Sequence, residues 1–397
     1  QGKHDLAIEE YTKAIEIDPK EPIYYENRGR RYLAKEVYDQ SLANFTSAID
    51  LDKENPERYN HRADCYIEME DYTNALKDLD RAIDLAPENP RWYNNRAGFY
   101  KTQENYDEAL KDYAKAIEIS SDDHQTTRAI NNRARIYEKE EKWELCIEEL
   151  TKAIAINPKA LYYGNRAYYW QQLEDYEKAL ADYTSAIDLD KENPERYDDR
   201  ADCYIAMENY TNALKDFDKA VDLAPEVPYY LIPRAALYKD QEEYDLALKD
   251  VNDAIQIDPN STYAYNWLGH ISLIIEDYDK ALFSFNKVIE IDNKDIYTYS
   301  RRADLYFQLE NYEKALADYT SAIDLDKENS TRYDDRAACY IAMEDYTSAL
   351  KDLDKAIDLA PENPLYLNNR ADFYDDQGKS DEALKDYATV IEISTDD

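Results

Sequence analysis

Arginine and acidic residues recur in this sequence at a constant separation of 16 residues. The clearest pairs are Arg62/Asp78, Arg96/Asp112, Arg200/Asp216 and Arg336/Asp352. A planar guanidinium group matches a carboxylate with two parallel hydrogen bonds, so these residue types predict an internal ion pair. The alternative is a ladder of arginines that binds an anionic ligand. We favour the internal pair, because a carboxylate at a constant separation would already occupy each guanidinium group.

No arrangement typical of an active site is present in the sequence. The four histidines, His4, His61, His124 and His270, have no recurring acid or nucleophile beside them. There is no glycine-rich phosphate loop, Cys-x-x-Cys pair or His-Glu-x-x-His motif. The acidic run 50–54 resembles a calcium loop but lacks its central glycine and its final glutamate. We therefore expect no enzymatic activity, no cofactor and no metal site.

Composition narrows the classes of partner. The 397 residues include 48 basic and 87 acidic side chains, which gives a net charge of −39. Nucleic acid is disfavoured, because its phosphates need lysine and arginine, whereas basic partners or divalent cations are favoured. No run approaches 18 consecutive apolar residues, so we expect no membrane span. The chain opens at Gln1 without a methionine or a visible signal segment, and we infer no compartment.

The arginine and acidic residues belong to a block of about 34 residues that recurs twelve times. A small residue followed by a branched one marks each block, as in Ala48-Ile49 and Ala82-Ile83, and two steps of 37 and 33 residues are the exceptions. A fixed period predicts stacked repeats, because one unit could not bury its own apolar face. Numbered from prolines such as Pro56, each block predicts helices over positions 2–15 and 18–31.

Small and aromatic residues also recur at fixed positions of the block. Positions 8 and 20 are small, as in Ala63 and Ala75, and positions 11 and 17 are aromatic, as in Tyr66 and Tyr72. This pattern resembles the tetratricopeptide repeat over essentially all 397 residues. The resemblance implies an all-α, right-handed superhelical solenoid of helix-turn-helix repeats, with a concave groove lined by the first helices. We expect one solenoid over residues 1–397, whose first repeat lacks its first helix.

The chain departs from the family pattern at one position. Position 7, usually leucine in that family, is arginine here, and position 23 is acidic. The complete repeat that lacks the arginine has Leu268, and it also has Ser284 in place of the acid. Because the two changes occur together, they support the internal pair. We expect this repeat to be locally apolar and to lack the ion pair.

The resemblance places positions 5 and 9 of the first helices on the groove. These positions carry Asn60, Asp64, Asn94, Asn131, Asp198, Asp202, Asn266, Asp304, Asp334 and Asn368. The Lys-and-Asn clamp with which some family members bind C-terminal carboxylates is not reproduced there. An Asp/Asn wall predicts binding of extended, basic or hydrogen-bonding protein segments. The alternative is that these residues only keep an open face hydrated.

A longer period is superimposed on the first. Residues 176–193 recur identically at 312–329, which indicates three four-repeat cassettes over approximately 1–123, 124–261 and 262–397. Two functions follow from different observations. The groove composition favours a non-enzymatic scaffold that binds protein or peptide segments. The duplicated cassettes favour a structural protein that self-associates end to end into fibres from a longer array.

Overall fold

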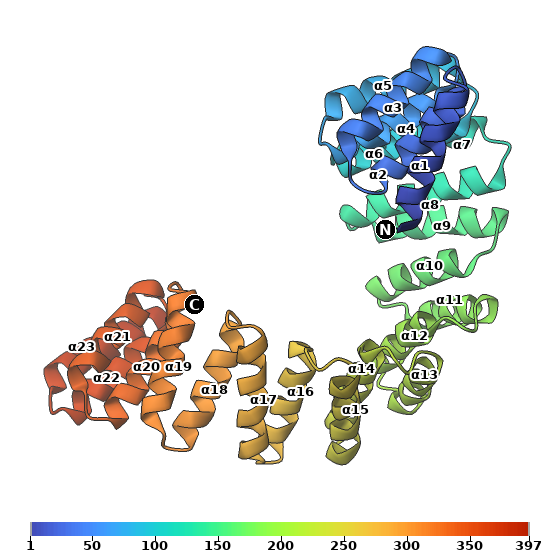
Figure 1. Cartoon of the computed structure of the whole chain (residues 1–397). Coiled ribbons are helices and arrows are strands. Elements are labelled where there is room, and N and C mark those ends of the chain that lie inside the picture. The colour runs from blue at the N-terminus through green and yellow to red at the C-terminus, as the bar shows by residue number, and fades with distance from the viewer. Residues whose placement is uncertain (1, 396–397) are drawn as a thin grey trace. The chain divides into compact units, whose positions relative to one another are not determined.

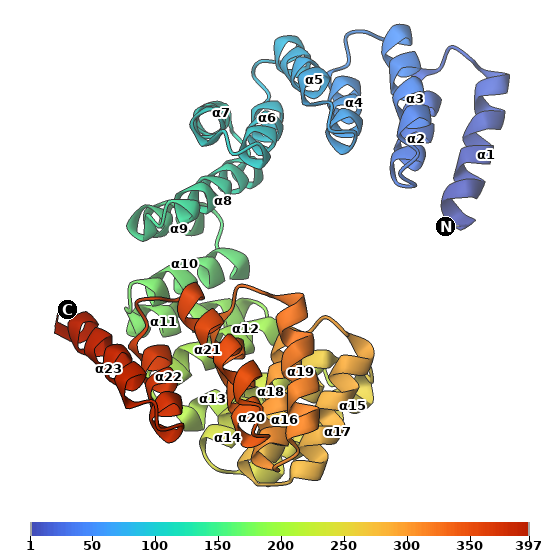
Figure 2. The same ribbon diagram turned by 90° about the vertical axis from the view of Figure 1, so that its left-hand side faces the viewer.

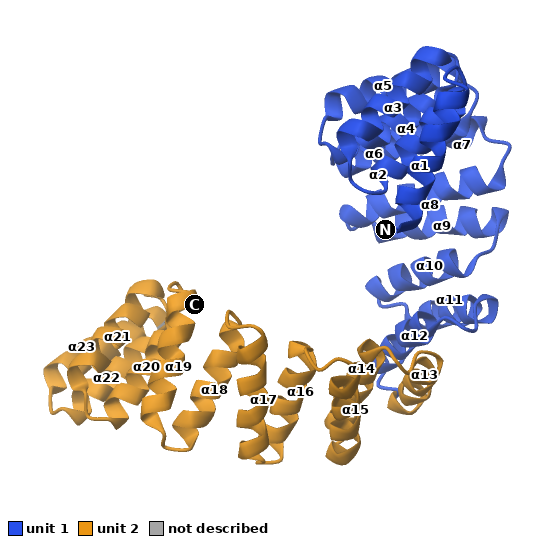
Figure 3. Ribbon diagram, in the orientation of Figure 1, with its two compact units in different colours: residues 1–209 blue, residues 210–397 orange. Residues whose placement is uncertain are grey.

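The computed structural model describes residues 2–395, and these form α-helices, one 3-10 turn and no strand (Figures 1 and 2). They fall into two compact units, residues 1–209 and residues 210–397 (Figure 3). The all-α class is therefore confirmed. The extent of the four-repeat cassettes stays a prediction.

The first unit consists of twelve helices among its described residues. They are α1 (Gly2–Ile17), α2 (Pro22–Leu33), α3 (Tyr38–Leu51), α4 (Pro56–Glu68), α5 (Tyr72–Leu85), α6 (Pro90–Thr102), α7 (Tyr106–Ile119), α8 (Asp123–Lys139), α9 (Trp143–Ile156), α10 (Ala160–Gln172), α11 (Tyr176–Leu189) and α12 (Pro194–Ala206).

The second unit continues the same alternation of helices and short turns. Its elements are α13 (Tyr210–Leu223), η1 (Pro228–Tyr230), α14 (Leu231–Asp240), α15 (Tyr244–Ile257), α16 (Thr262–Ile274), α17 (Tyr278–Ile291), α18 (Ile296–Gln308), α19 (Tyr312–Leu325), α20 (Ser330–Ala342), α21 (Tyr346–Leu359), α22 (Pro364–Asp376) and α23 (Ser380–Thr395).

Local chemistry explains where the first helices begin. Asn55 precedes Pro56, and its side-chain oxygen accepts the backbone N–H of Glu57 at 3.0 Å. Such a cap satisfies one of the free N–H groups at a helix start, and proline suits the next position because it has no N–H to leave unpaired. The same Asn-Pro start opens three other first helices, at Asn89, Asn193 and Asn363.

The turn inside each hairpin places one residue in the left-handed region. Gly378 occupies that place between α22 and α23, with φ 70°. In the other hairpins the residue is glutamate, for example Glu310 with φ 56°. A β-carbon makes this conformation cost roughly 1–2 kcal/mol. The glutamates are Glu36, Glu70, Glu104, Glu141, Glu174, Glu208, Glu242, Glu276, Glu310 and Glu344.

Within each unit, a hairpin packs its two helices together and then packs its second helix on the first helix of the next hairpin. Small residues where the two helices cross allow them to approach closely. Ala97 and Ala109 are fully buried and face each other across α6 and α7, with Tyr113 beside them. Each hairpin thus completes the core of its neighbour. Among the described helices, none combines the length and the apolar character that a bilayer crossing requires.

Candidate binding face and internal ion pairs

Position-7 arginines join the two helices of a hairpin. Nε of Arg62 donates to Oδ2 of Asp78 at 2.7 Å, and Nη2 donates to Oδ1 at 2.8 Å. The Asp78 carboxylate is buried, with 5% of the residue exposed. The same paired bonds, at 2.7–2.9 Å, join Arg96 to Asp112, Arg166 to Asp182, Arg234 to Asp250, Arg302 to Asp318, Arg336 to Asp352 and Arg370 to Asp386. For Arg200 and Asp216, which belong to different units, the pair stays a prediction.

The same guanidinium group also contacts the preceding hairpin. Nη1 of Arg96 donates to Oδ1 of Asp80 at 2.7 Å, and Asp80 belongs to α5. The rings of Tyr93 and Tyr100 flank the guanidinium carbon at 6.0 and 5.9 Å, within reach of a cation–π interaction. The hydrogen bond to Asp112 is the main cause that raises the pKa of Arg96. Internal groups therefore surround this cation, which leaves little room for a ligand.

The hairpin of α16 and α17 fills the same space with apolar atoms. Leu268 is buried and packs in one cluster with Ile271 and Val288. The hydroxyl of Ser284 donates to the carbonyl oxygen of Lys280 at 2.7 Å, inside its own helix. The position-7 and position-23 side chains of this hairpin thus take part in separate interactions.

Position-5 side chains lie between consecutive first helices. Nδ2 of Asn95 in α6 donates to Oδ1 of Asn60 in α4 at 2.8 Å, and Asn60 is buried. Nδ2 of Asn369 in α22 donates to Oδ2 of Asp334 in α20 at 2.7 Å. Similar contacts join Asn165 to Asn131, Thr298 to Asn266, and Asn94 to the Gln125 carbonyl oxygen. These side chains join neighbouring hairpins, while Oδ1 of Asn94 and Oδ1 of Asp334 have no hydrogen-bond partner among the described residues.

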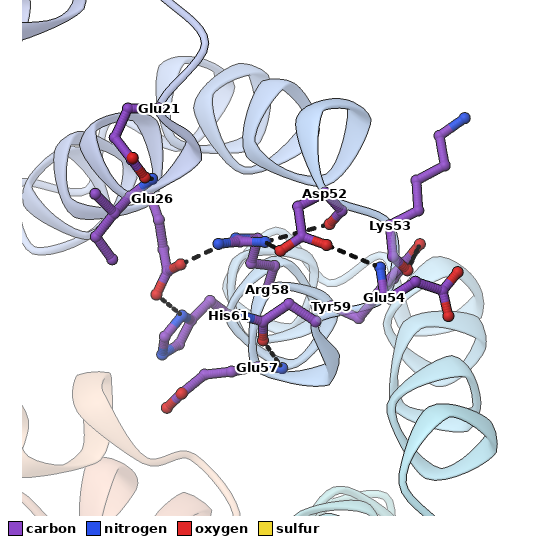
Figure 4. A network of polar contacts seen from close by, with 11 residues as sticks. Glu21, Glu26, Asp52, Lys53, Glu54, Glu57, Arg58, Tyr59 and His61 are labelled. Carbon is purple, nitrogen blue, oxygen red and sulfur yellow. Dashed lines mark hydrogen bonds and ion pairs between the residues drawn. The ribbon is translucent and has the colours of Figure 1, made fainter. Parts of the chain in front are cut away.

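An ionic network joins Glu26, the position-5 side chain of α2, to residues of α4 and of the turn before it (Figure 4). Nε of Arg58 donates to Oε2 of Glu26 at 3.2 Å, and Nη1 pairs with the Asp52 carboxylate. Nδ1 of His61 lies 3.3 Å from Oε1 of Glu26. Burial opposes ionisation of the Glu26 carboxyl, but His61 and Arg58 lower its pKa overall. Position 5 is again used to join two hairpins.

Position-9 side chains are the more accessible members of the predicted set. Asp64, Asp202 and Asp304 are exposed. Desolvation by the surrounding helices nevertheless raises the pKa of Asp64 and of Asp202. Asp304 accepts a hydrogen bond from the hydroxyl of Tyr319 at 2.5 Å. Of the remaining predicted residues, Asp198 is buried and Asn368 is half-buried.

Hollows open on the face made by the first helices. In the first unit, a hollow of about 650 Å³ between α4, α6 and α8 brings Asn60, Asp64 and Asn94 together. Another, of about 540 Å³, lies between α2 and α4 and shares Asp64. In the second unit, hollows of about 390 and 510 Å³ lie along α16/α18 and α20/α22, and they include Asn266 and Asp334 respectively.

Aromatic and basic residues also line these hollows; Tyr263 was expected from the sequence to be exposed and suited to peptide contacts, whereas Trp267, Tyr297 and Arg301 were not predicted. Tyr263, Trp267 and Tyr297 line the hollow along α16 and α18, and Tyr263 and Tyr297 are largely exposed. Arg301 lies beside them, with Nη1 3.5 Å from Nδ1 of His270. These residues occupy positions 2, 6 and 9 of their repeats. A comparison of positions 2 and 6 between repeats could have identified Trp267, Tyr297 and Arg301. Within residues 2–395, no group of three or more His, Cys, Asp or Glu side chains is arranged to hold a metal ion.

Sequence comparison assigns the family. Profiles of the tetratricopeptide repeat match residues 1–32, 56–89, 88–159, 160–193, 194–227, 262–295, 296–329 and 335–397. The chain belongs to the tetratricopeptide repeat family, as its registered small and aromatic positions predicted. No match was found among the curated proteins.

Solved structures of similar proteins are also repeat proteins. Yeast Tom70 is 19% identical over 100% of this chain and 93% of its own, with a TM-score of 0.45. A tetratricopeptide repeat protein from Parabacteroides merdae is 20% identical over 66% of this chain and 99% of its own, with a TM-score of 0.45. YrrB, described as having an unusual peptide-binding site, is 29% identical over 46% of this chain and 94% of its own, with a TM-score of 0.37.

Proposed function

We propose that the chain is a non-enzymatic scaffold that binds protein segments along the face made by its first helices. The observation that carries this proposal is the series of hollows on that face. Each one lies between consecutive first helices, and its lining differs from repeat to repeat. An extended segment crossing several hairpins could place one side chain in each hollow. Varied linings would then give such a segment its specificity.

Charge favours basic segments for most of this face. The chain carries a net charge of −39, and Asp64, Asp202 and Asp304 are exposed on first helices. Attraction between these carboxylates and lysine or arginine falls steeply with ionic strength. Binding of basic peptides should therefore weaken as salt rises from about 0.05 to 0.5 M. The arginines do not compensate this acidity, because most of them already pair with internal carboxylates.

An array of short peptides probed with the full chain tests the proposal. The variant Asp64→Lys/Asp202→Lys reverses two exposed charges on first helices. The matched control Asp107→Lys/Glu177→Lys makes the same charge change at exposed positions of the second helices α7 and α11. We expect basic peptides to bind the wild type and the control but not the first-helix variant. The proposal would be contradicted if both variants lost basic-peptide binding equally, or if the wild type bound no peptides at all.

End-to-end self-association is the second candidate function. The identity of residues 176–193 and 312–329 supports it, because a duplicated cassette lets one stacking contact repeat without change. Electron microscopy of the purified chain separates the two functions. A structural polymer would give continuous fibres, whereas a scaffold would give separate particles.

A further inference from the structure

A hollow between α19, α20 and α21 carries lysines that no acidic side chain neutralises. It has a volume of about 720 Å³, and most of its lining comes from the second helices α19 and α21. Lys327, Lys351 and Lys355 line it, and all three are exposed. None of the three forms an ion pair with another described residue. These cations are therefore available to a partner.

The acidic side chains of this hollow fall into two groups. Asp352 and Asp354 each accept a hydrogen bond from an arginine, at 2.7 and 2.6 Å, so their charges are already neutralised. Asp324 and Asp358 are exposed and form no ion pair among the described residues. The accessible charges of the hollow are thus three lysines and two aspartates. This surface is nearly neutral and carries both signs, whereas the chain as a whole carries −39.

The residues that line this hollow recur twice more in the sequence. All of them are identical 136 residues earlier, within 187–222. Within 49–84 they are identical again, except that Arg81 stands in place of a lysine. Lysine at position 32 of the repeat occurs only in these three sets, as Lys53, Lys191 and Lys327. Residues 187–222 belong partly to each unit, so the likeness there is one of sequence.

The turn that carries the position-32 lysine is held in the same way in both units. In the second unit, the hydroxyl of Tyr333 donates to the carbonyl oxygen of Lys327 at 3.2 Å. In the first unit, the hydroxyl of Tyr59 donates to the carbonyl oxygen of Lys53, also at 3.2 Å. Lys53 is exposed as well. A fixed backbone lowers the conformational entropy that a contact through these lysines must offset.

We infer that this hollow is a contact between two copies of the chain, in which the lysines of one copy meet Asp324 and Asp358 of the other. Copies with a net charge of −39 repel one another, so they approach most easily where the local charge is nearly balanced. A surface that carries both signs is complementary to itself, as a contact related by a two-fold axis requires. A second copy also carries the same three sets in the same order.

This contact goes beyond the proposed function and does not depend on it. The hollow shares no lining residue with the hollows on the face of the first helices, so a peptide and a second copy would use separate surfaces. The contact also differs from end-to-end stacking. Stacking would use the terminal helices α1 and α23, whereas the three lysine sets lie between them in the chain.

Sedimentation equilibrium of the full chain over about 1–100 μM tests the inference with two charge-reversal variants. The first reverses the exposed lysine at position 22 of each set, in Lys77→Glu/Lys215→Glu/Lys351→Glu. The second reverses the exposed aspartate at position 29 of each set, in Asp84→Lys/Asp222→Lys/Asp358→Lys. We expect the wild type to associate reversibly and each variant alone to associate at least about tenfold more weakly, because several exposed pairs are reversed together. An equimolar mixture of the two variants should restore the association, which also excludes unfolding as the cause of the loss.

A matched control makes the same charge change at position 22 of hairpins whose preceding turn lacks the position-32 lysine. It is Lys111→Glu/Lys249→Glu/Lys385→Glu, in α7, α15 and α23. This control should associate as the wild type does. The inference is overturned if the wild type stays monomeric, if the control weakens as much as the first variant, or if the mixture associates no better than its components. Association that neither variant changes would also overturn it, and would point to end-to-end stacking instead.

Discussion

Two neighbouring hairpins of the second unit carry different side chains at the two positions that meet between their helices. In α18 and α19, Arg302 donates two hydrogen bonds of 2.7 Å to the buried Asp318. In α16 and α17, the same two positions carry Leu268, which packs among apolar side chains, and Ser284, which bonds within its own helix. Both hairpins pack their two helices together and continue the stack. The ion pair is therefore one of two ways to fill the same space.

This difference separates the structural positions of the repeat from the recognition positions. In one hairpin, leucine replaces the arginine and serine replaces its acid. An arginine that can be replaced in this way is a packing element of the hairpin. We propose that recognition depends on positions 2, 6 and 9 of the first helices, where neighbouring repeats differ. The hollow along α16 and α18 is aromatic through Tyr263, Trp267 and Tyr297, whereas Lys101 and Arg128 line the hollow between α4, α6 and α8.

The largest expected effect comes from breaking one ion pair. Asp318→Ala leaves the Arg302 guanidinium, whose side chain is 16% exposed, without its main partner. We expect a loss of about 2–3 kcal/mol in the free energy of unfolding, somewhat less than for fully buried pairs because the guanidinium is partly hydrated. Urea denaturation measures the change. As a control, Glu290→Ala breaks the exposed pair with Lys287 and should cost less than about 0.5 kcal/mol.

A smaller effect is expected when both partners are replaced by the residues of the neighbouring hairpin. Arg302→Leu/Asp318→Ser reproduces the Leu268/Ser284 combination, so no charge is left buried and unpaired. The double variant should lie within about 1 kcal/mol of the wild type, since apolar replacements of buried ion pairs are often neutral. Urea curves of the wild type, Arg302→Leu, Asp318→Ser and the double variant form a double-mutant cycle. A double variant as unstable as the sum of the two single variants would show no coupling between the two side chains and would contradict the internal pair.

A pH-dependent effect is expected at the acidic part of the first-helix face. Burial, together with the Asp304 and Asp334 carboxylates, raises the pKa of Asp335 to about 7. The folded chain then holds a proton that the unfolded chain releases, so this contribution to stability is lost as pH rises through about 7. Asp335→Asn should therefore raise the unfolding midpoint at about pH 8 and change it little at about pH 3, below the ordinary pKa of an aspartate. The exposed Asp324→Asn should give no such difference between the two pH values.

Much of the fold could be predicted because it depends on residues that recur. The period of about 34 residues, the Asn-Pro helix starts and the paired arginine and acid positions appear in most repeats, so each repeat supports the others. The glutamates with positive φ could not be predicted, because glutamate is not typical of the left-handed region. The hairpin turn imposes this conformation, because Gly378 adopts a similar positive φ at the equivalent place in its own hairpin.

The candidate site was harder to predict because it depends on residues that do not recur. Position 5 was expected to face a partner, which stays a prediction; that Asn60 and Asp334 also bond the next hairpin was not predicted. Single-repeat reasoning cannot anticipate this, since the partner side chain belongs to position 6 of another repeat. The hollows likewise combine side chains of two or three first helices.

The most direct test of the account compares peptide binding by the wild type and by Arg302→Leu/Asp318→Ser. The double variant removes one guanidinium group and its acid while leaving the hollows of the first helices unchanged. If the position-7 arginines are packing elements, the peptide array should give the same bound peptides, with affinities within about twofold, because separate sites contribute independently. Selective loss of acidic peptides by the double variant would contradict the account. That result would mean that the arginines form a ladder that binds anions.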